Sequence, residues 1–316
     1  MNQRESNDHR CMCRPNCVHV AIMNVIGAGM GIPFSLLLCL GMAGFARAEP
    51  PDSKTSAEKD AVAKAAWREL LNRQPAEYTI YAGGEAKKSL SLRTQPVLRW
   101  ANLTRITSKE AGTFIWTAGT ALAPADAGRP EAVACAFTVD PQGSEFAIDL
   151  QSLSRGPLVA VRNGSRVWFP SQPGVKFRPV PDAPAPADSS VARLRQMKTL
   201  ARRFSVKMLG WMEVGGSDQE ELRMFPQPIY RYHGPDPELL DGALFVFVQG
   251  TDPETLLMLE AVRTQTGLQW QYDLVRRTSA ALEGRYQGKT VWEAPMAHYP
   301  TNPQATRIEF RHKLQQ

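Results

Sequence analysis

The sequence predicts an α+β fold with an internal duplication: two modules, each of one N-terminal helix plus about seven mostly antiparallel strands. Three observations predict this fold class. Apolar residues recur with helical spacing over 61–71 and 191–204. Short segments rich in β-branched and aromatic residues follow each helix, separated by turn residues. Several of these segments resemble one another in the same order along both halves.

The first predicted module covers residues 57–170. Trp67, Leu70 and Leu71 share one face of its helix, which ends at Pro75. The Asn163-Gly164 pair predicts a tight hairpin turn, because both residues tolerate positive φ. The expected strands are 78–81, 89–92, 97–100, 113–117, 132–139 and 146–153, followed by a hairpin over 158–169.

Residues 171–187 form a proline-rich connector, and the second predicted module covers 188–310. Because proline donates no backbone hydrogen bond, the connector is expected to be a stiff, extended link. Asp188 or Ser189 caps the second helix, whose apolar stripe runs from Leu194 to Phe204. The strands expected after it are 205–211, 221–225, 229–232, 243–248, 255–261, 269–276 and 282–292.

The duplication is predicted from four matched blocks in the same order. The longest is gapless: residues 145–168 match 269–292 with six identities, against roughly one or two expected by chance. Trp168 then corresponds to Trp292. Shorter blocks match 95–100 with 227–232, 112–117 with 242–247, and 128–131 with 251–254. The alternative is that hairpins of similar chemistry arose independently. Neither module is much over a hundred residues, so the two are expected to pack together.

Two Arg and Asp pairs are repeated in the matched blocks: Arg99 with Asp149, and Arg231 with Asp273. A residue present in both copies is expected to serve the shared fold. We therefore expect each arginine to pair with a carboxylate on a neighbouring strand.

The N-terminal segment predicts export. An apolar run over 31–46 is too short to span a bilayer as a helix and ends in Ala46-Arg47-Ala48, a pattern that signal peptidase recognises. Residues 1–48 are therefore expected to be a signal peptide cleaved before Glu49, with residues 49–56 a flexible start of the mature chain. The alternative is an uncleaved anchor, and Met1, Met12 or Met23 could be the true start. The expected location is the periplasm or the extracellular envelope, with no stable membrane span after cleavage.

Cysteine usage and net charge give no support for a reactive thiol or for nucleic-acid binding. The mature chain keeps only Cys135, in an apolar strand pattern, so it is expected to be buried and inert. Residues 1–48 carry a net charge of +2, and their removal lowers the net charge from +6 to +4. This mild excess, without a basic run interleaved with aromatics, does not predict nucleic-acid binding.

The mature chain lacks familiar catalytic motifs, including His-Glu-x-x-His, Gly-x-Ser-x-Gly and phosphate-binding glycine loops. No cofactor and no metal are predicted. The acidic residues around 236–241 lack the spacing of a calcium loop. Most of the tryptophans are expected to lie in the core.

The best local candidate for a site is the segment 230–238, at a strand-to-loop junction. His233 could act as an acid or base with Asp236 as its orienting partner, and Tyr230, Tyr232 and His233 could contact a ligand. The plainer interpretation is a solvated turn. Because Tyr230, His233 and Asp236 occur in only one copy, any activity is expected there or where the modules meet.

Several strings, among them 97–102, 227–232 and 241–254, resemble a family of uncharacterised exported proteins common in planctomycete-type bacteria. The resemblance covers nearly the whole mature chain and implies export, with no chemistry to carry over. The leading hypothesis is an exported binding or interaction protein whose envelope ligand or partner is unknown. The alternatives are a cell-envelope hydrolase with a site at the module interface, and a carrier of an apolar ligand.

Overall fold

The computed structural model describes residues 56–83, 88–102, 108–119, 128–139, 144–209, 219–233, 236–298 and 300–313. The predicted signal peptide and all but the last residue of the predicted flexible segment 49–56 lie outside the described residues. Among the described residues the fold is mostly antiparallel β-sheet with two α-helices, which is consistent with the α+β class expected from the sequence and also with a mainly β class.

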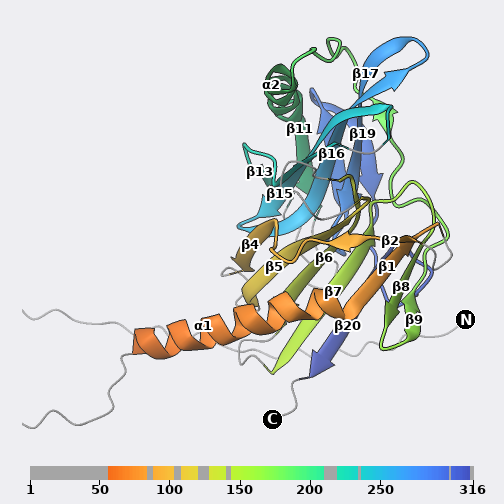
Figure 1. Ribbon diagram of the computed structural model, residues 1–316. Helices are drawn as coiled ribbons and strands as arrows, with labels where there is room; N and C mark the ends of the chain where they lie inside the picture. Colours follow the sequence, from red (N-terminus) through yellow and green to blue (C-terminus); the bar gives the residue numbers. More distant parts are fainter. Residues whose placement is uncertain are drawn as a thin grey trace, which may run out of the picture. The chain divides into compact units, whose positions relative to one another are not determined.

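The first half of the chain begins with the helix α1 and continues in short strands (Figure 1). Pro75 lies in a short 3-10 helix directly after α1, so the predicted helix end is confirmed. The elements are α1 (Ser56–Arg73), η1 (Gln74–Glu77), β1 (Tyr78–Ala82), β2 (Lys88–Ser89), β3 (Ser91–Leu92), β4 (Leu98–Asn102), β5 (Ser108–Thr117), β6 (Pro130–Thr138), β7 (Glu145–Ser152), β8 (Leu158–Arg162) and β9 (Ser165–Trp168).

The second half begins with the connector and the helix α2. Ser189 is the N-cap of α2, and its hydroxyl accepts a hydrogen bond from the Ala192 amide at 3.2 Å. The elements are β10 (Arg178–Pro179), α2 (Ser190–Ala201), β11 (Phe204–Met208), β12 (Glu220–Glu221), β13 (Arg223–Met224), β14 (Tyr230–Tyr232), β15 (Leu239–Gln249), β16 (Asp252–Thr264), β17 (Gly267–Arg276), β18 (Leu282–Tyr286), β19 (Lys289–Ala294) and β20 (Arg307–Lys313).

These strands form four sheets, two in each half. The four-stranded sheets have the orders β2-β1-β8-β9 and β12-β11-β18-β19. The six-stranded sheets have the orders β20-β7-β6-β5-β3, with β4 also on β5, and β10-β17-β16-β15-β13, with β14 also on β15. In each half the helix packs on the six-stranded sheet: α1 contacts β5 and β6, and α2 contacts β15 and β16.

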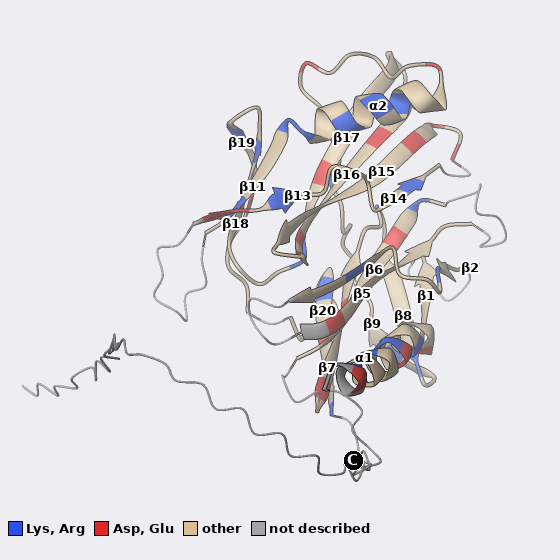
Figure 2. Ribbon diagram, turned by 90° about the vertical axis from the view of Figure 1, so that its left-hand side faces the viewer, with Lys and Arg blue, Asp and Glu red and all other residues tan. Residues whose placement is uncertain are grey.

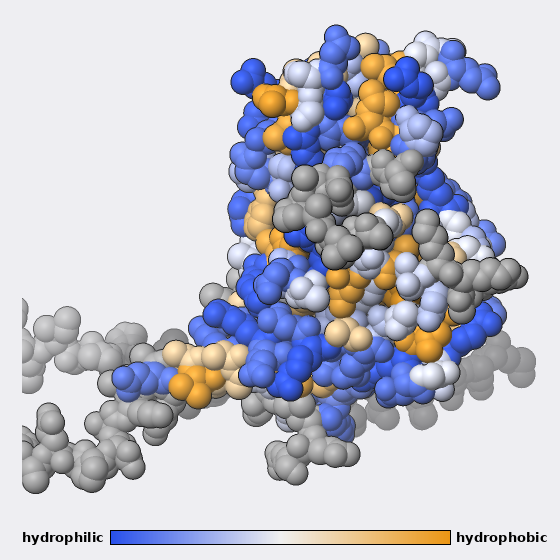
Figure 3. Space-filling view, in the orientation of Figure 1, coloured by the Kyte–Doolittle hydropathy of each residue, from blue (hydrophilic) through white to orange (hydrophobic). Residues whose placement is uncertain are grey.

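Each half encloses its own apolar core. In the second half, Met197 and Leu200 of α2 pack with Phe204, Trp270 and Tyr272 of the sheets. In the first half, α1 and both sheets enclose a corresponding core that includes Trp116 and Trp168, which are 1% and 0% exposed. The described tryptophans are buried or partly buried, as expected for core residues. The face shown in Figure 3 is mainly hydrophilic, with scattered apolar patches.

The two six-stranded sheets pack against each other through a third apolar cluster. Ile115 and Val133 of the first half meet residues such as Leu244, Val246 and Met258 of the second. Successive side chains of a strand point to opposite faces, so β15 is buried on both: Ala243, Phe245 and Phe247 face α2, and the residues between them face the other sheet. Residues 54–316 accordingly form one compact unit, and the expected packing of the two halves is confirmed.

Each six-stranded sheet receives its edge strand from outside its own half. β10 lies in the proline-rich connector and pairs with β17, and β20 pairs with β7 of the first half along its whole length. The connector, expected as an extended link, also contributes a short edge strand, and residue 310, where the predicted second module ends, lies within β20. His312 is held in β20, with its ring stacked on Phe146 at 4.9 Å.

A tight hairpin lies at one edge of each four-stranded sheet, β8–β9 in the first half and β18–β19 in the second. Asn163 and Gly164 have φ of 50° and 75°, which confirms the turn predicted between β8 and β9. Gln287 and Gly288 have φ of 49° and 80° between β18 and β19. The segment 282–292, expected as one strand, is therefore a hairpin. No helix among the described residues is long and apolar enough to cross a membrane.

Candidate functional site

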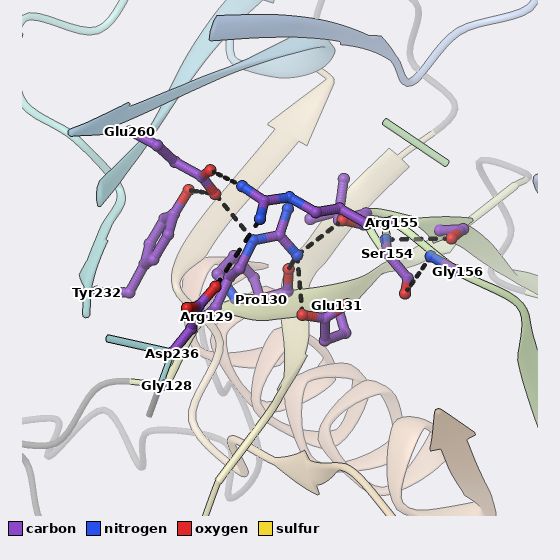
Figure 4. A network of polar contacts seen from close by, with 12 residues as sticks. Gly128, Arg129, Pro130, Glu131, Ser154, Arg155, Gly156, Tyr232, Asp236 and Glu260 are labelled. Atoms are coloured by element: carbon purple, nitrogen blue, oxygen red, sulfur yellow. Dashed lines mark hydrogen bonds and ion pairs between the residues drawn. The ribbon is translucent and has the colours of Figure 1, made fainter. Parts of the chain in front are cut away.

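A polar cluster that connects the two halves is centred on Glu260 of β16 (Figure 4). We call Glu260, Arg129, Arg155, Tyr232 and Gln271 the seam cluster. Glu260 is 0% exposed although it carries a carboxylate, so its charge must be compensated inside the protein. Glu260 points toward the seam, the region where the two halves meet, because its neighbours Leu259 and Ala261 face the core beneath α2 and successive side chains of a strand alternate faces.

Four donors converge on the Glu260 carboxylate. Oε1 accepts from Arg129 Nε at 2.8 Å and from the Tyr232 hydroxyl at 3.1 Å. Oε2 accepts from an Arg155 guanidinium nitrogen at 2.6 Å and from Gln271 Nε2 at 2.7 Å. A carboxylate offers about four lone-pair sites, so these bonds use its acceptor capacity. Glu260 therefore has no free lone pair with which to take a proton from a substrate.

Local geometry places the Tyr232 hydroxyl on Glu260. Tyr232 lies opposite Gly242 in the β14–β15 pairing, and Gly242 lies opposite Glu260 in the next pairing. A Cβ atom at Gly242 would come within 2.3 Å of the Tyr232 ring. Only glycine therefore leaves room for the ring to cross β15 and reach the carboxylate. Burial raises the pKa of Tyr232 well above its usual value, so the phenol keeps the proton that it donates.

Arg129 and Arg155 come from the first half and connect it to β16. Arg129 precedes β6, is 7% exposed at its side chain, and also donates to Glu131 at 2.8 Å and to the Leu153 carbonyl at 3.1 Å. Burial alone would lower the pKa of Arg129, but the carboxylates of Glu260 and Glu131 raise it above its usual value. The guanidinium therefore stays charged, and the opposed charges of the seam cluster compensate each other inside the protein.

The residues predicted from the sequence lie around this cluster. Tyr232 belongs to it. Tyr230 is buried, donates its hydroxyl proton to the Gly128 carbonyl at 3.0 Å, and lies beneath the guanidinium of Arg93. Burial raises the pKa of Tyr230. Asp236 lies at the outer side of the cluster, with its carboxylate 4.0 Å from the partly exposed guanidinium of Arg155.

His233 and Asp236 are the exposed part of the candidate. His233 directly follows β14 and is exposed. Asp236 accepts a hydrogen bond from the Glu238 amide at 2.9 Å, the contact of an Asx turn, which fits the interpretation of this segment as a solvated turn. The two tyrosines thus serve the seam, and only His233 and Asp236 face solvent.

Sequence reasoning missed the centre of the cluster. Glu260 lies in the apolar run Leu256-Leu-Met-Leu-Glu-Ala261, where a single carboxylate requires a buried partner. That isolated charge was the available signal. Its partners Arg129 and Arg155 are more than a hundred residues away in sequence, so their identity could not be read from local spacing.

The two repeated arginines differ in their contacts. Arg231 pairs, as expected, with a carboxylate on a neighbouring strand, Asp241 of β15, at 2.6 Å. Arg99 instead donates to the side-chain carbonyl of Asn72 at 3.2 Å. Asp149 forms buried ion pairs with Arg277 and with Arg307 of β20, which ties the second half to the first.

Cys135 is buried as expected, 3.4 Å from the Thr113 hydroxyl, and burial raises the pKa of its thiol. Among the described residues no three His, Cys, Asp or Glu side chains gather as metal ligands. Two open pockets lie elsewhere. One, of about 230 Å³, lies beside β8 and β9, and one, of about 180 Å³, lies beside α2.

Comparison with protein-family models, with curated proteins and with solved structures finds no match.

Proposed function

We propose that this chain is an exported, non-catalytic binding protein of the cell envelope. The observation that carries the proposal is the saturation of Glu260 by four donors from both halves. A general base must have a free lone pair within reach of its substrate. The buried polar groups of the seam instead hold the two halves together, so the chemistry available to a ligand lies on the surface.

The filled interiors favour binding at the surface over transport of an apolar ligand inside a module. In the second half Phe204 packs against Tyr272 and Tyr286, with ring centroids 4.8 and 4.7 Å apart. A carrier would need a roomy apolar cavity where these rings lie. The hydrolase alternative rests on His233 and Asp236, the exposed groups beside the seam.

We further propose that the two halves are copies of one module. The orders of the four-stranded sheets correspond strand for strand, and so do those of the six-stranded sheets. Trp168 lies opposite Ala160, and Trp292 lies opposite Gly284. Both residues of the second pair lie 124 positions after their counterparts in the first pair. One proposed match is displaced by a residue: Gly112 lies opposite Arg99, but Gly242 lies opposite Tyr232 rather than Arg231.

A turnover assay separates the binding protein from the hydrolase. Residues 49–316 would be incubated with soluble peptidoglycan fragments, and released products would be measured by mass spectrometry. The proposal predicts no product above that of the heat-denatured protein. Product formation that falls in His233→Ala but not in His298→Ala, a control at another exposed histidine, would overturn it in favour of the hydrolase.

A further inference from the structure

The pocket beside α2 is a groove between that helix and the connector, lined by Pro184, Arg195, Gln196, Thr199, Leu200 and Arg203. We call it the α2 groove. Gln196 fixes its wall: its amide accepts from the Ala187 amide at 2.8 Å and donates to the Ala185 carbonyl at 2.9 Å. Arg193 adds bonds to the carbonyls of Ala187 and Asp188. The connector is thus held against the helix, and the groove is preformed.

The α2 groove is cationic, and its charge is not compensated by the helix itself. Residues 190–203 contain five basic and no acidic residues, and Figure 2 shows α2 with Lys and Arg but without Asp or Glu. Arg193 is paired with Asp241 at 3.0 Å. In the part of the chain that the structure describes, the guanidinium of Arg195 has no partner, and that of Arg203 contacts only the Tyr286 hydroxyl, at 3.3 Å.

The corresponding helix of the first half differs. The α1 segment 56–73 contains three acidic and four basic residues, and two of its arginines are paired: Arg68 with Glu110 and Arg73 with Glu69. If the halves are copies, features that serve the fold should recur in both. The unpaired cations of α2 do not recur, so the shared fold does not require them.

The interior of the groove is apolar. Leu200, which is 1% exposed, and Pro184 line it together with the alkyl stems of the arginines. The groove measures about 180 Å³, below the ~300–1,000 Å³ typical of pockets for drug-sized ligands. This space suits one anionic head group and the first carbons of a chain.

We propose that the α2 groove binds a single anionic amphiphile, with a phosphate or carboxylate between Arg195 and Arg203 and an alkyl segment along Pro184 and Leu200. The proposal rests on the proposed binding function and names its ligand class. Guanidinium groups suit these anions because their planar donors match the oxygens of either group. The apolar lining adds the burial of the attached carbons.

Octyl phosphate, used below its micelle concentration, is the probe, and isothermal calorimetry on residues 49–316 is the measurement. The expected result is saturable binding of octyl phosphate that weakens with salt, with no binding of octyl glucoside, and weaker binding of inorganic phosphate. Arg195→Gln should weaken octyl phosphate binding about tenfold, because one charge-assisted hydrogen bond is lost. Arg202→Gln removes an equal charge next to the helix but outside the groove, and should change the affinity less than about twofold.

Equal effects of Arg195→Gln and Arg202→Gln would overturn the groove in favour of general charge attraction. Binding to anionic vesicles without binding of monomeric octyl phosphate would overturn it in favour of a membrane surface. If octyl phosphate fails to bind while an unrelated ligand co-purifies with the protein, the ligand class is wrong and the binding function stands. Turnover of envelope fragments would instead remove the binding function itself.

Discussion

Replacing Glu260 with glutamine removes one negative charge from the seam cluster and leaves the side chain nearly the same size. The Arg129 guanidinium, 7% exposed, then keeps its positive charge but loses its fully buried partner. The new amide also presents N–H donors to groups that are themselves donors. Because glutamine keeps only one side-chain oxygen, two of the four donors that converge on Glu260 lose that acceptor.

The magnitude follows from the burial of each partner. Removing one member of a buried ion pair costs about 3–5 kcal/mol, because an uncompensated charge remains inside. Arg129 keeps its contact with Glu131, which is 14% exposed at its side chain, so the expected loss for Glu260→Gln is about 3 kcal/mol, the lower end of that range. Arg155 is 45% exposed, and Arg155→Gln should cost about 1 kcal/mol or less.

Urea unfolding at pH 7 measures both variants against the parent chain. The reasoning requires Glu260→Gln to lower the unfolding midpoint much more than Arg155→Gln, with an unchanged m-value. If the two variants lose equal stability, or if Glu260→Gln loses less than about 1 kcal/mol, the seam cluster does not hold the halves together.

Three further predictions concern single positions. Burial raises the pKa of Asp273 to about 6. Because this folded-state pKa lies above the unfolded-state one, the free energy of unfolding of the parent should fall by about 2–3 kcal/mol relative to that of Asp273→Asn as the pH rises from 4 to 7. Parallel curves of unfolding free energy against pH for the two proteins would refute this. Gln287 is exposed with φ of 49°, where its counterpart is Asn163, so Gln287→Asn should stabilise the protein by about 0.5–1 kcal/mol in the same unfolding assay; a loss of stability would contradict the shared turn. Cys135 should react with a thiol reagent at least about a thousandfold more slowly in the native protein than in urea, because labelling requires opening of the sheet; rapid native labelling would show an accessible thiol.

Local patterns predicted the local structure well. The apolar spacing, the Ser189 cap and the Asn163-Gly164 turn each depend on neighbouring residues, and all three are found in the structure. The turn at Gln287 was missed because glutamine rarely adopts positive φ, so nothing in its residue type signals a hairpin. The available signals were the adjacent Gly288 and the match of Gly164 with Gly288 between the two halves.

The long-range pairings could not be predicted from the sequence. β20 pairs with β7, about 160 residues earlier, and the edge strand β10 lies in a segment whose prolines indicated a linker. The same limit applies to the candidate site. Tyr230 and Tyr232 were predicted to contact a ligand at a strand-to-loop junction. Their actual partners, Gly128 and Glu260, follow from the packing of two sheets, which no local pattern encodes.

Native mass spectrometry of the protein purified from the exported fraction of its cells distinguishes a binding protein from an enzyme. We expect a chain beginning at Glu49 that carries a chemically intact, non-covalent anionic amphiphile, which is lost on collisional activation and is depleted in Arg195→Gln. A ligand-free chain that converts envelope fragments into products would contradict the binding function.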